Sequence, residues 1–221
     1  MTSFLDVFTQ HLGTSYARQL ALADLVGDRP WSADLDAGTI SFGDEFVFQA
    51  QFLGSRSNID DTWLWGWGNH HGYAPAVLEA SIKIQAFGEV QDISELMDRK
   101  FKLGPITDHM VAMACRGILD GDCYYRAPYD DGAAFLLLAG LPPEVTQPVA
   151  QERVSPLLIE ILSSFHVNHR LLAESFLAEQ GFVIDTREDG AEATRGNTRF
   201  IMTFDHLDRI TSIEGKLVPH P

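Results

Sequence analysis

The sequence predicts an α+β fold in which antiparallel β-meanders pack against helices. Apolar residues near the start of the chain recur every three or four positions, which is the spacing of one helix face. Several later runs alternate apolar and polar residues between glycine or aspartate turns, which is typical of strands. The content of 45% hydrophobic and 21% charged residues is that of a globular protein, so we expect a single α+β domain over residues 1–221.

The first third of the chain predicts one helix followed by a meander. The helix begins after Ser3, a suitable N-cap, and ends near Gly27, before Pro30. The clearest strand is the run EFVFQAQFLG, in which alternate phenylalanines share one face. The expected strands are residues 31–36, 39–43, 45–54 and 62–69, with a polar loop over residues 55–61.

The middle of the chain predicts helices and then a hairpin. The expected helices are residues 74–88, 92–101 and 107–122, and the last is capped by Thr107 and apolar on most sides. The hairpin covers residues 123–140 and turns at Asp130 and Asp131. Its second arm, AAFLLLAG, is apolar throughout, which indicates a strand buried on both faces.

The last third of the chain predicts helical structure and a second meander. A proline-rich connector over residues 141–156 precedes helical spacing over residues 155–181, which fits one long helix or two abutting helices. Strands are expected over residues 181–218. Both ends of the chain then share a helix followed by about four strands. This plan predicts pseudo-repeated halves, residues 1–72 and 153–221, around a middle insertion of residues 73–152.

Charge and cysteine content exclude several classes of function. The net charge of −15 repels phosphate groups, so we expect neither nucleic-acid binding nor attraction to anionic membranes. The sequence contains no run of 18 apolar residues, so we expect no membrane-spanning helix. The first residues lack the pattern of a secretory signal. Cys115 and Cys123 are too few for a disulfide framework, so we expect a cytoplasmic protein with reduced thiols. The acidic surface either binds a basic partner or serves solubility.

The segment TWLWGWGN is the first candidate site. On a strand, Trp63, Trp65 and Trp67 project to one face and form a broad indole-lined wall. Gly66 and Gly68 project to the other face, where a packed helix or a ligand comes close to the backbone. The tryptophan wall either holds a flat or hydrophobic ligand or is a core stripe covered by a helix.

Two polar-aromatic clusters are further candidates for ligand binding. His70, His71 and Tyr73 follow the Trp-rich strand, where loops often carry function. The two adjacent histidines point in opposite directions on an extended chain and cannot easily share one metal. Tyr125 and Arg126 lie in the run CYYRAPYDD, where Arg126 either binds a carboxylate or phosphate or forms a structural ion pair with an aspartate.

Support for catalysis is weak, and we assign no catalytic residues. His166 and His169 are three apart and would share one face of a continuous helix, a spacing that zinc often uses. The geometry is lost if Asn168 caps a second helix. The chain lacks the G-x-S-x-G, H-E-x-x-H and phosphate-loop motifs. We expect no cofactor and no metal.

Several motifs together resemble one family. TWLWGWGN, LGPITDHMVAMACRGILDGDCYYRAPYDDGAAFLLLAG and RFIMTFDHLDRI resemble the DUF6882 proteins, an uncharacterised bacterial family. The resemblance spans most of residues 30 to 140. It implies a bacterial setting but no activity and no catalytic residues.

Three hypotheses of function follow, in order of preference. The first is a non-enzymatic protein that binds a basic protein partner, in the manner of an antitoxin or an immunity protein. The second is a small-molecule binder with a pocket at the Trp-rich strand. The third is a metal-dependent hydrolase that uses His166, His169 and acidic groups.

Overall fold

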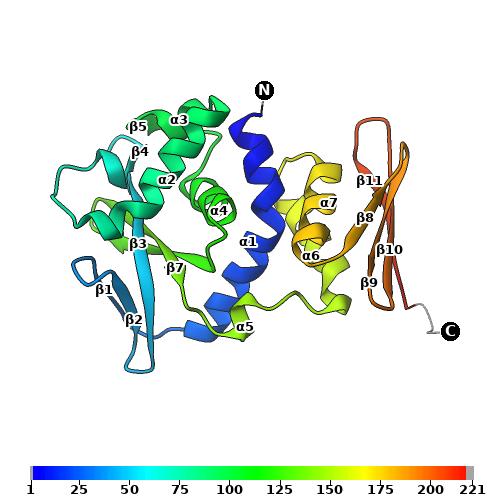
Figure 1. Ribbon diagram of the computed structural model, residues 1–221, viewed down its shortest axis with the longest axis horizontal. Coiled ribbons are helices and arrows are strands. Elements are labelled where there is room, and N and C mark those ends of the chain that lie inside the picture. Colours follow the sequence, from blue (N-terminus) through cyan, green and yellow to red (C-terminus); the bar gives the residue numbers. More distant parts are fainter. Residues whose placement is uncertain (1, 218–221) are drawn as a thin grey trace.

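The computed structural model describes residues 2–217 and has the α+β class that the sequence predicts. Two antiparallel sheets lie at opposite ends, and helices fill the space between them (Figure 1). None of the helices in residues 2–217 combines the length and the hydropathy needed to span a bilayer. The helices are α1 (Phe4–Val26), α2 (Pro75–Gln91), α3 (Ser94–Met97), α4 (Asp108–Ile118), α5 (Pro143–Thr146), α6 (Gln151–Ser164) and α7 (His169–Glu179), with a 3-10 turn η1 (Gly66–Gly68).

The larger sheet has seven strands and is built around β3. On one edge of β3, the pairing order is β1-β2-β3-β4-β5, and on its other edge β3 pairs with β7, which pairs with β6. The strands are β1 (Trp31–Asp34), β2 (Thr39–Phe42), β3 (Phe46–Ser57), β4 (Thr62–Trp65), β5 (Lys100–Lys102), β6 (Cys123–Tyr129) and β7 (Gly132–Ala139).

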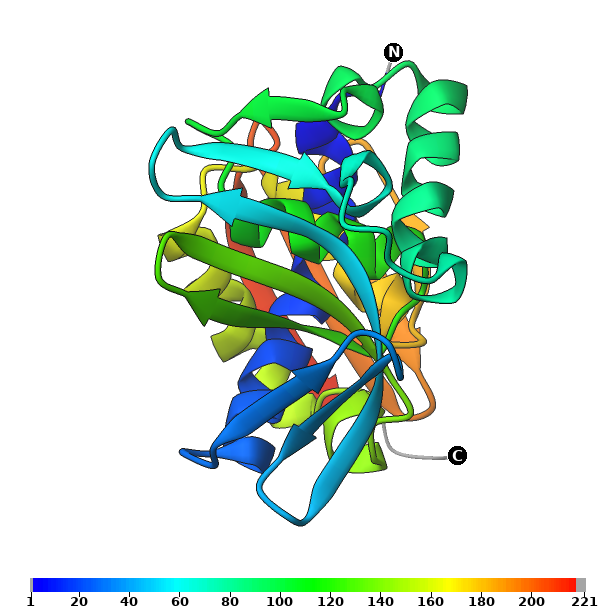
Figure 2. The ribbon, with the colours of Figure 1, turned by 90° about the vertical axis from the view of Figure 1, so that its left-hand side faces the viewer.

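This sheet is curled because β3 is irregular. Its first part pairs with β2 and its last part with β4, and its register with β7 shifts between Phe52 and Gly54. Such a bulge bends a strand and increases its twist. As a result, the ring centroid of Phe42 in β2 lies 4.8 Å from that of Tyr125 in β6, although β3 and β7 separate these strands. The first two strands thus cover part of the face that Figure 2 shows.

The two faces of the curled sheet have different surroundings. The inner face, which includes Trp63, Trp65 and Phe135, packs in one core cluster with residues of α1 and α4. The outer face, which includes Phe52 and Leu136, packs in a second cluster with β1, β2 and the end of α1. The uncovered part of this outer face is where the candidate site lies.

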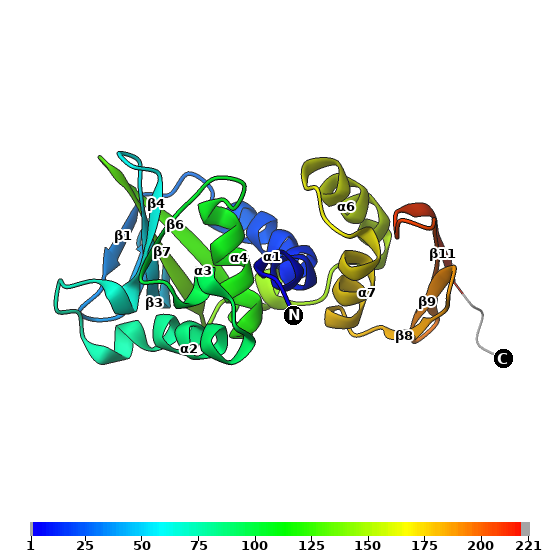
Figure 3. The ribbon, with the colours of Figure 1, turned by 90° about the horizontal axis from the view of Figure 1, so that it is seen from above.

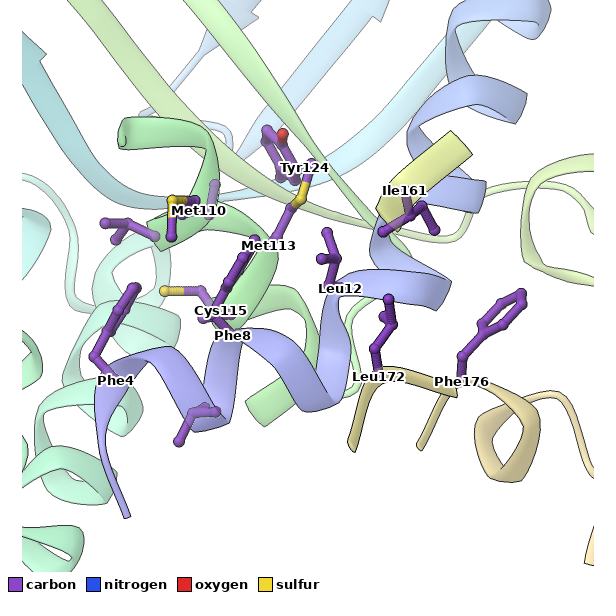
Figure 4. Packing of buried hydrophobic residues seen from close by; sticks show 14 of the residues in the cluster. Phe4, Phe8, Leu12, Met110, Met113, Cys115, Tyr124, Ile161, Leu172 and Phe176 are labelled. Atoms are coloured by element: carbon purple, nitrogen blue, oxygen red, sulfur yellow. The ribbon is translucent and has the colours of Figure 1, made fainter. Parts of the chain in front are cut away.

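Helix α1 is the centre of the molecule. A capping box starts it, since the Ser3 hydroxyl accepts from the Asp6 amide and the Asp6 carboxylate accepts from the Ser3 amide at 2.9 Å. The helix lies between α4 on one side and α6 and α7 on the other (Figure 3). Buried side chains from these helices meet along α1 (Figure 4). A Cβ at Gly13 would lie 2.6 Å from Phe176, so glycine permits the close contact with α7.

The second sheet is separate from the first and contains four strands in the order β11-β10-β9-β8. Phe200 and Met202 are buried on the face that packs against the helices. The two expected meanders therefore do not join into one sheet, and the expected strand residue Val218 lies outside the described residues. The strands are β8 (Val183–Thr186), β9 (Gly190–Arg195), β10 (Thr198–Phe204) and β11 (Ile210–Leu217).

Some predicted boundaries are wrong, and one alternative that the sequence leaves open is decided. The expected helix over 92–101 is a single turn, α3, and its last residues form β5. The helical run over 155–181 forms two helices, the second of its two predicted alternatives, because the Asn168 side chain accepts from the Leu171 amide at 2.8 Å and caps α7. The middle segment, residues 73–152, contributes three strands to the first sheet. The proposed duplication of the flanking halves stays a prediction.

Candidate functional site

The Trp-rich segment does not form an open indole wall. Strand β4 ends at Trp65, and the chain then turns into η1, so Trp67 leaves the row that the sequence predicts. Trp63 and Trp65 are 0% exposed, with their ring centroids 5.3 Å apart. The Trp65 indole donates to the Glu95 carbonyl at 3.0 Å. These two tryptophans are core residues of the inner face, and the expectation that they line an open pocket is wrong.

The glycines between the tryptophans are explained by close packing. A Cβ at Gly66 would lie 2.6 Å from the Phe52 carbonyl oxygen and 3.0 Å from the Ser81 hydroxyl of α2. A Cβ at Gly68 would lie 2.4 Å from Arg99. The two glycines therefore lie in the turn after β4, and not on the strand face that the sequence predicts, and the close approach of β3, α2 and Arg99 explains why these positions are glycine.

The opposite side of β4 carries a pocket of about 450 Å³, which we call the sheet pocket. Strands β3 and β4 form its floor with Ser55, Ser57, Thr62 and Leu64. The loop after η1 adds Asn69, His71 and Tyr73, and Lys100 and Tyr129 lie at its margins. The pocket is on the outer face, where no helix lies in front of the strands (Figure 2).

Strand alternation places these floor residues on the outer face. Ser55 pairs with Leu64, and Ser57 pairs with Thr62, so their side chains leave the same side of the sheet. The residues between them, Arg56 and Trp63, point to the inner face. Ala134 of β7 is opposite Ser55, and its small side chain leaves room for the pocket.

The Asp60 carboxylate beside the floor is engaged by neighbouring side chains. Its oxygens accept from the Lys100 ammonium at 2.7 Å and from the Thr62 hydroxyl at 2.8 Å. Hydrogen bonds from Lys100, Ser57 and Thr62 hold the pKa of Asp60 well below its usual value. The side chain is therefore an anion at neutral pH and a weak base.

The loop after η1 is held against the sheet by an aromatic contact. The Tyr73 ring meets Phe52 edge to face, with centroids 5.2 Å apart. The Asn69 carbonyl oxygen accepts from the His71 amide at 3.1 Å, and Gly72 adopts a positive φ of 71°. Burial and, to a smaller extent, the nearby Tyr129 raise the pKa of Tyr73, so its hydroxyl stays protonated.

The structure brings together only part of the predicted ligand site. His71 and Tyr73 line the sheet pocket, whereas His70 is exposed and does not. Tyr125 packs against Trp31 and Phe42 in the second core cluster, with centroids 5.6 Å and 4.8 Å away. Tyr125 does not line the pocket.

Arg126 forms an ion pair with an aspartate, which is the second of the two interpretations of this residue. Its Nε lies 3.6 Å from the buried Asp108 carboxylate at the start of α4. Arg56 also reaches Asp108, at 3.4 Å, and Asp61, at 3.2 Å. This cluster ties β3 and β6 to α4 on the inner face, away from the sheet pocket.

His166 and His169 do not share one helix face, because Asn168 caps a second helix, the alternative in which that geometry is lost. His166 lies in the loop between α6 and α7, and His169 begins α7. The His169 Nδ1 accepts from the Ile210 amide at 3.3 Å, which orients the ring toward β11. Within residues 2–217, no group of three or more His, Cys, Asp or Glu side chains is arranged to hold a metal ion.

The two cysteines are buried thiols, as expected. Burial raises the pKa of Cys123 to about 12, and it raises the pKa of Cys115 further, so both remain protonated. Neither residue lines the sheet pocket.

Sequence reasoning missed the floor of the pocket. Residues 55–61 are predicted as a loop, yet β3 continues through Ser57. The available signal was the alternation of small and large polar residues in Ser55, Arg56 and Ser57, which continues the period of the preceding strand. Lys100 was missed because β5 was predicted as the end of a helix.

These features define a class: an α+β protein with a curled antiparallel sheet whose outer face carries an open, hydroxyl-lined pocket. The chain belongs to the family of unknown function DUF6882, whose model matches residues 5–141. The match covers the Trp-rich segment and the β6–β7 hairpin but not the third motif, residues 199–210. No curated protein and no solved structure matches the chain.

Proposed function

We propose that this protein binds a small organic molecule in the sheet pocket. The observation that carries the proposal is an open pocket with unused hydrogen-bonding groups. Its volume of about 450 Å³ is within the range of about 300–1,000 Å³ that small-molecule sites occupy. Within residues 2–217, the hydroxyls of Ser55 and Tyr73 form no hydrogen bond with another side chain or with the backbone, so both are free for a ligand.

We infer that Asp60 is not a general base of the pocket. A general base works best when its pKa is close to the operating pH. The pKa of Asp60 is instead lowered by three hydrogen bonds, which makes it a poor proton acceptor. Its contacts with Lys100 and Thr62 support a structural role at the pocket margin.

A thermal-unfolding screen with a pocket-filling variant tests the proposal. Ser55→Leu adds bulk to the floor without changing the inner face, and Ser212→Leu changes an exposed strand serine of the second sheet. A library metabolite at about 100 times its Kd should raise the Tm of the wild type and of S212L by roughly 5–10 °C. S55L should remain folded and lose that response. Equal responses in all three proteins, or no response to any metabolite, would contradict the proposal.

The second candidate function is binding of a basic protein partner, in the manner of an antitoxin or an immunity protein. The observation that favours it is a concentration of exposed acidic side chains between the end of α1 and the start of β3. Within residues 2–217, only Glu45 of this group forms an ion pair, with Arg29 at 2.7 Å. The acidic residues are Asp24, Asp28, Asp34, Asp36, Asp44 and Glu45.

A charge-reversal experiment separates this candidate from simple solubility. A specific basic partner should bind with an affinity that falls as salt is raised, because exposed charges are screened. Asp36→Lys with Asp44→Lys should weaken capture of the partner more than the same reversal at Glu188 and Glu214, which are also exposed. Equal weakening by both pairs would indicate a non-specific effect of net charge.

We place this binding activity in the cytoplasm of a bacterium. The bacterial setting rests on the family resemblance. The cytoplasmic setting is supported by two free buried thiols, because thiols persist in reducing compartments.

A further inference from the structure

We propose that the sheet pocket takes a small organic carboxylate with an apolar body, an inference that rests on the proposed ligand-binding function. The pocket combines hydrogen-bond donors, a local positive charge and an apolar wall. Each of these three features comes from a different part of the lining.

Most hydrogen-bond acceptors of the lining are already engaged. The Asp60 carboxylate accepts hydrogen bonds from Lys100 and Thr62, and the Asn69 carbonyl oxygen accepts one from the His71 amide. The Ser57 hydroxyl oxygen accepts from the Ile59 amide at 3.3 Å. A ligand that mainly donates hydrogen bonds would therefore depend on the Ser55 and Tyr73 hydroxyl oxygens, which can also donate.

Several donors remain free. With its carbonyl engaged, Asn69 retains an amide group that can only donate. The hydroxyls of Ser55 and Tyr73 are uncommitted within residues 2–217, and the Lys100 ammonium uses one of its three donors on Asp60. A hydroxyl can also accept, so the groups that can only donate are the Asn69 amide and the Lys100 ammonium, and these two fit a ligand that carries oxygen acceptors.

The basic residues nearest to the pocket add positive charge. Lys100 pairs across the strands with Leu64, and Lys102 pairs with Thr62, so both leave the outer face. No ion pair of Lys102 is found within residues 2–217. The net charge of −15 opposes an anion at long range, but charges beyond about 8 Å are screened at physiological ionic strength. Within the described part of the chain, Lys102 therefore brings a positive charge without a paired carboxylate close to the floor, whereas the charge of Lys100 is shared with Asp60.

The remaining lining is apolar and suits a planar body. Leu35, Phe52 and Leu64 border the pocket, and the Tyr73 ring stands beside them. Together with the donors, this wall favours an amphipathic anion over a fully polar one such as inorganic phosphate.

Isosteric probes test the ligand class. Benzoate and the uncharged benzamide have nearly the same shape, and phenyl phosphate presents a different anion on the same ring. Amide chemical shifts of ¹⁵N-labelled full-length protein should move at Ser55, Asn69 and Tyr73, and benzoate should bind at least about threefold tighter than benzamide at low salt. Lys102→Gln should reduce this preference by about twofold, the effect of one partly screened charge, whereas Lys216→Gln should leave it unchanged.

The outcomes separate this inference from the proposed function. Equal binding of benzoate and benzamide, a preference for benzamide, or a preference that K102Q does not reduce would overturn the carboxylate assignment. Binding of phenyl phosphate without benzoate would also overturn it. In these cases, the proposed ligand-binding function would still be supported if the probes change the amide chemical shifts of the pocket residues in the wild type but not in S55L. If no probe and no library compound shifts these residues, both proposals fail.

Discussion

At the scale of single residues, alternation along β4 separates two surfaces of opposite character. Trp63 and Trp65 point inward and are fully buried, whereas Thr62 and Leu64 point outward and line the sheet pocket. The Trp-rich segment thus contributes to the candidate site through its smaller side chains. The tryptophans stabilise the sheet on which that site is built.

The close packing behind the segment makes a stability prediction. Gly66→Ala should destabilise the protein by about 1–3 kcal/mol, because the new Cβ would meet the Phe52 carbonyl, which is backbone and cannot easily move. Gly104→Ala is the control, since a Cβ there has nothing within 4 Å. Urea unfolding measures both variants. An unchanged unfolding free energy for G66A would show that the strand and α2 do not pack as described.

His169 makes a prediction about pH. Burial and the nearby Arg209 lower its pKa below the ordinary 6.5, while Asp205 partly opposes them. The unfolded chain then binds this proton more readily than the folded chain, so the contribution to stability is present above pH 6.5 and is lost as the pH falls through and below that value.

The measurement is the unfolding free energy between pH 7.5 and pH 5. His169→Gln should flatten the fall in stability over this interval, whereas His70→Gln, at an exposed position, should leave the slope unchanged. Identical slopes for the wild type and H169Q would contradict the assigned role of the His169 ring.

Residue patterns in the sequence could predict that the Trp-rich segment contains a strand, but they could not predict which face of that strand is open to solvent. The alternation of Trp63 and Trp65 correctly predicts a shared side of a strand. Which side faces solvent depends on α2, α4 and the curl of the sheet, all of which are non-local. Similarly, Ser55 and Ser57 have turn-forming side chains, but pairing with strands on both edges keeps them in β3.

At the scale of elements, a polar contact joins three helices at the core. Arg116 of α4 is buried and donates to the Ser15 hydroxyl of α1 at 2.8 Å and to the Glu179 carboxylate of α7 at 3.3 Å. Glu179 also contacts His11 at 2.7 Å. Burial alone would raise the pKa of Glu179, but hydrogen bonds from His11 and Thr14 and the charge of Arg116 outweigh it and lower that pKa.

Removing one charge of this contact should be costly. Glu179→Gln leaves the Arg116 guanidinium buried without a countercharge and should cost about 2 kcal/mol. This is less than the roughly 3–5 kcal/mol of a fully buried pair, because the Glu179 side chain is 27% exposed. Urea unfolding should also show that adding Arg116→Met to E179Q recovers most of the loss.

An exposed pair is the matched control. Glu214→Gln removes the partner of Lys216, a pair on the surface of the second sheet, and should cost about 1 kcal/mol or less. Equal costs for E179Q and E214Q would contradict the importance of the α4–α7 contact.

Element prediction succeeded where the signal was local. Ser3 and Thr107 cap the helices that they are predicted to cap, and the hairpin turns at Asp130 and Asp131. It failed at β5, a three-residue strand that exists because it pairs with β4. Such a pairing leaves no pattern in its own short segment.

At the scale of the whole molecule, the family match and the core have different extents. The match ends at residue 141, whereas the core cluster around α1 continues into α6, α7 and the second sheet. Leu172 and Phe176 of α7 are fully buried in this cluster. We therefore expect residues 1–221 to unfold in one cooperative transition, as a single domain.

A truncation tests that expectation. A chain of residues 1–141 would expose the side of α1 that packs against α7, and we expect it to lose fixed tertiary structure or aggregate. All four tryptophans lie in this part, so near-ultraviolet circular dichroism can be compared directly with that of the full chain. A soluble fragment with the full-length spectrum and cooperative unfolding would show that residues 142–221 are a separate unit.

The arrangement of two separate sheets around α1 could not be predicted, because the packing partners of each meander lie far away in the sequence. The outer face of the first sheet stays partly open for the same reason. A crystallographic fragment screen on the full-length protein tests the central claim, ligand binding on this face, most directly. We predict fragments bound between Ser55, Leu64 and Tyr73. Fragments found only at other sites, with this pocket empty, would contradict the claim.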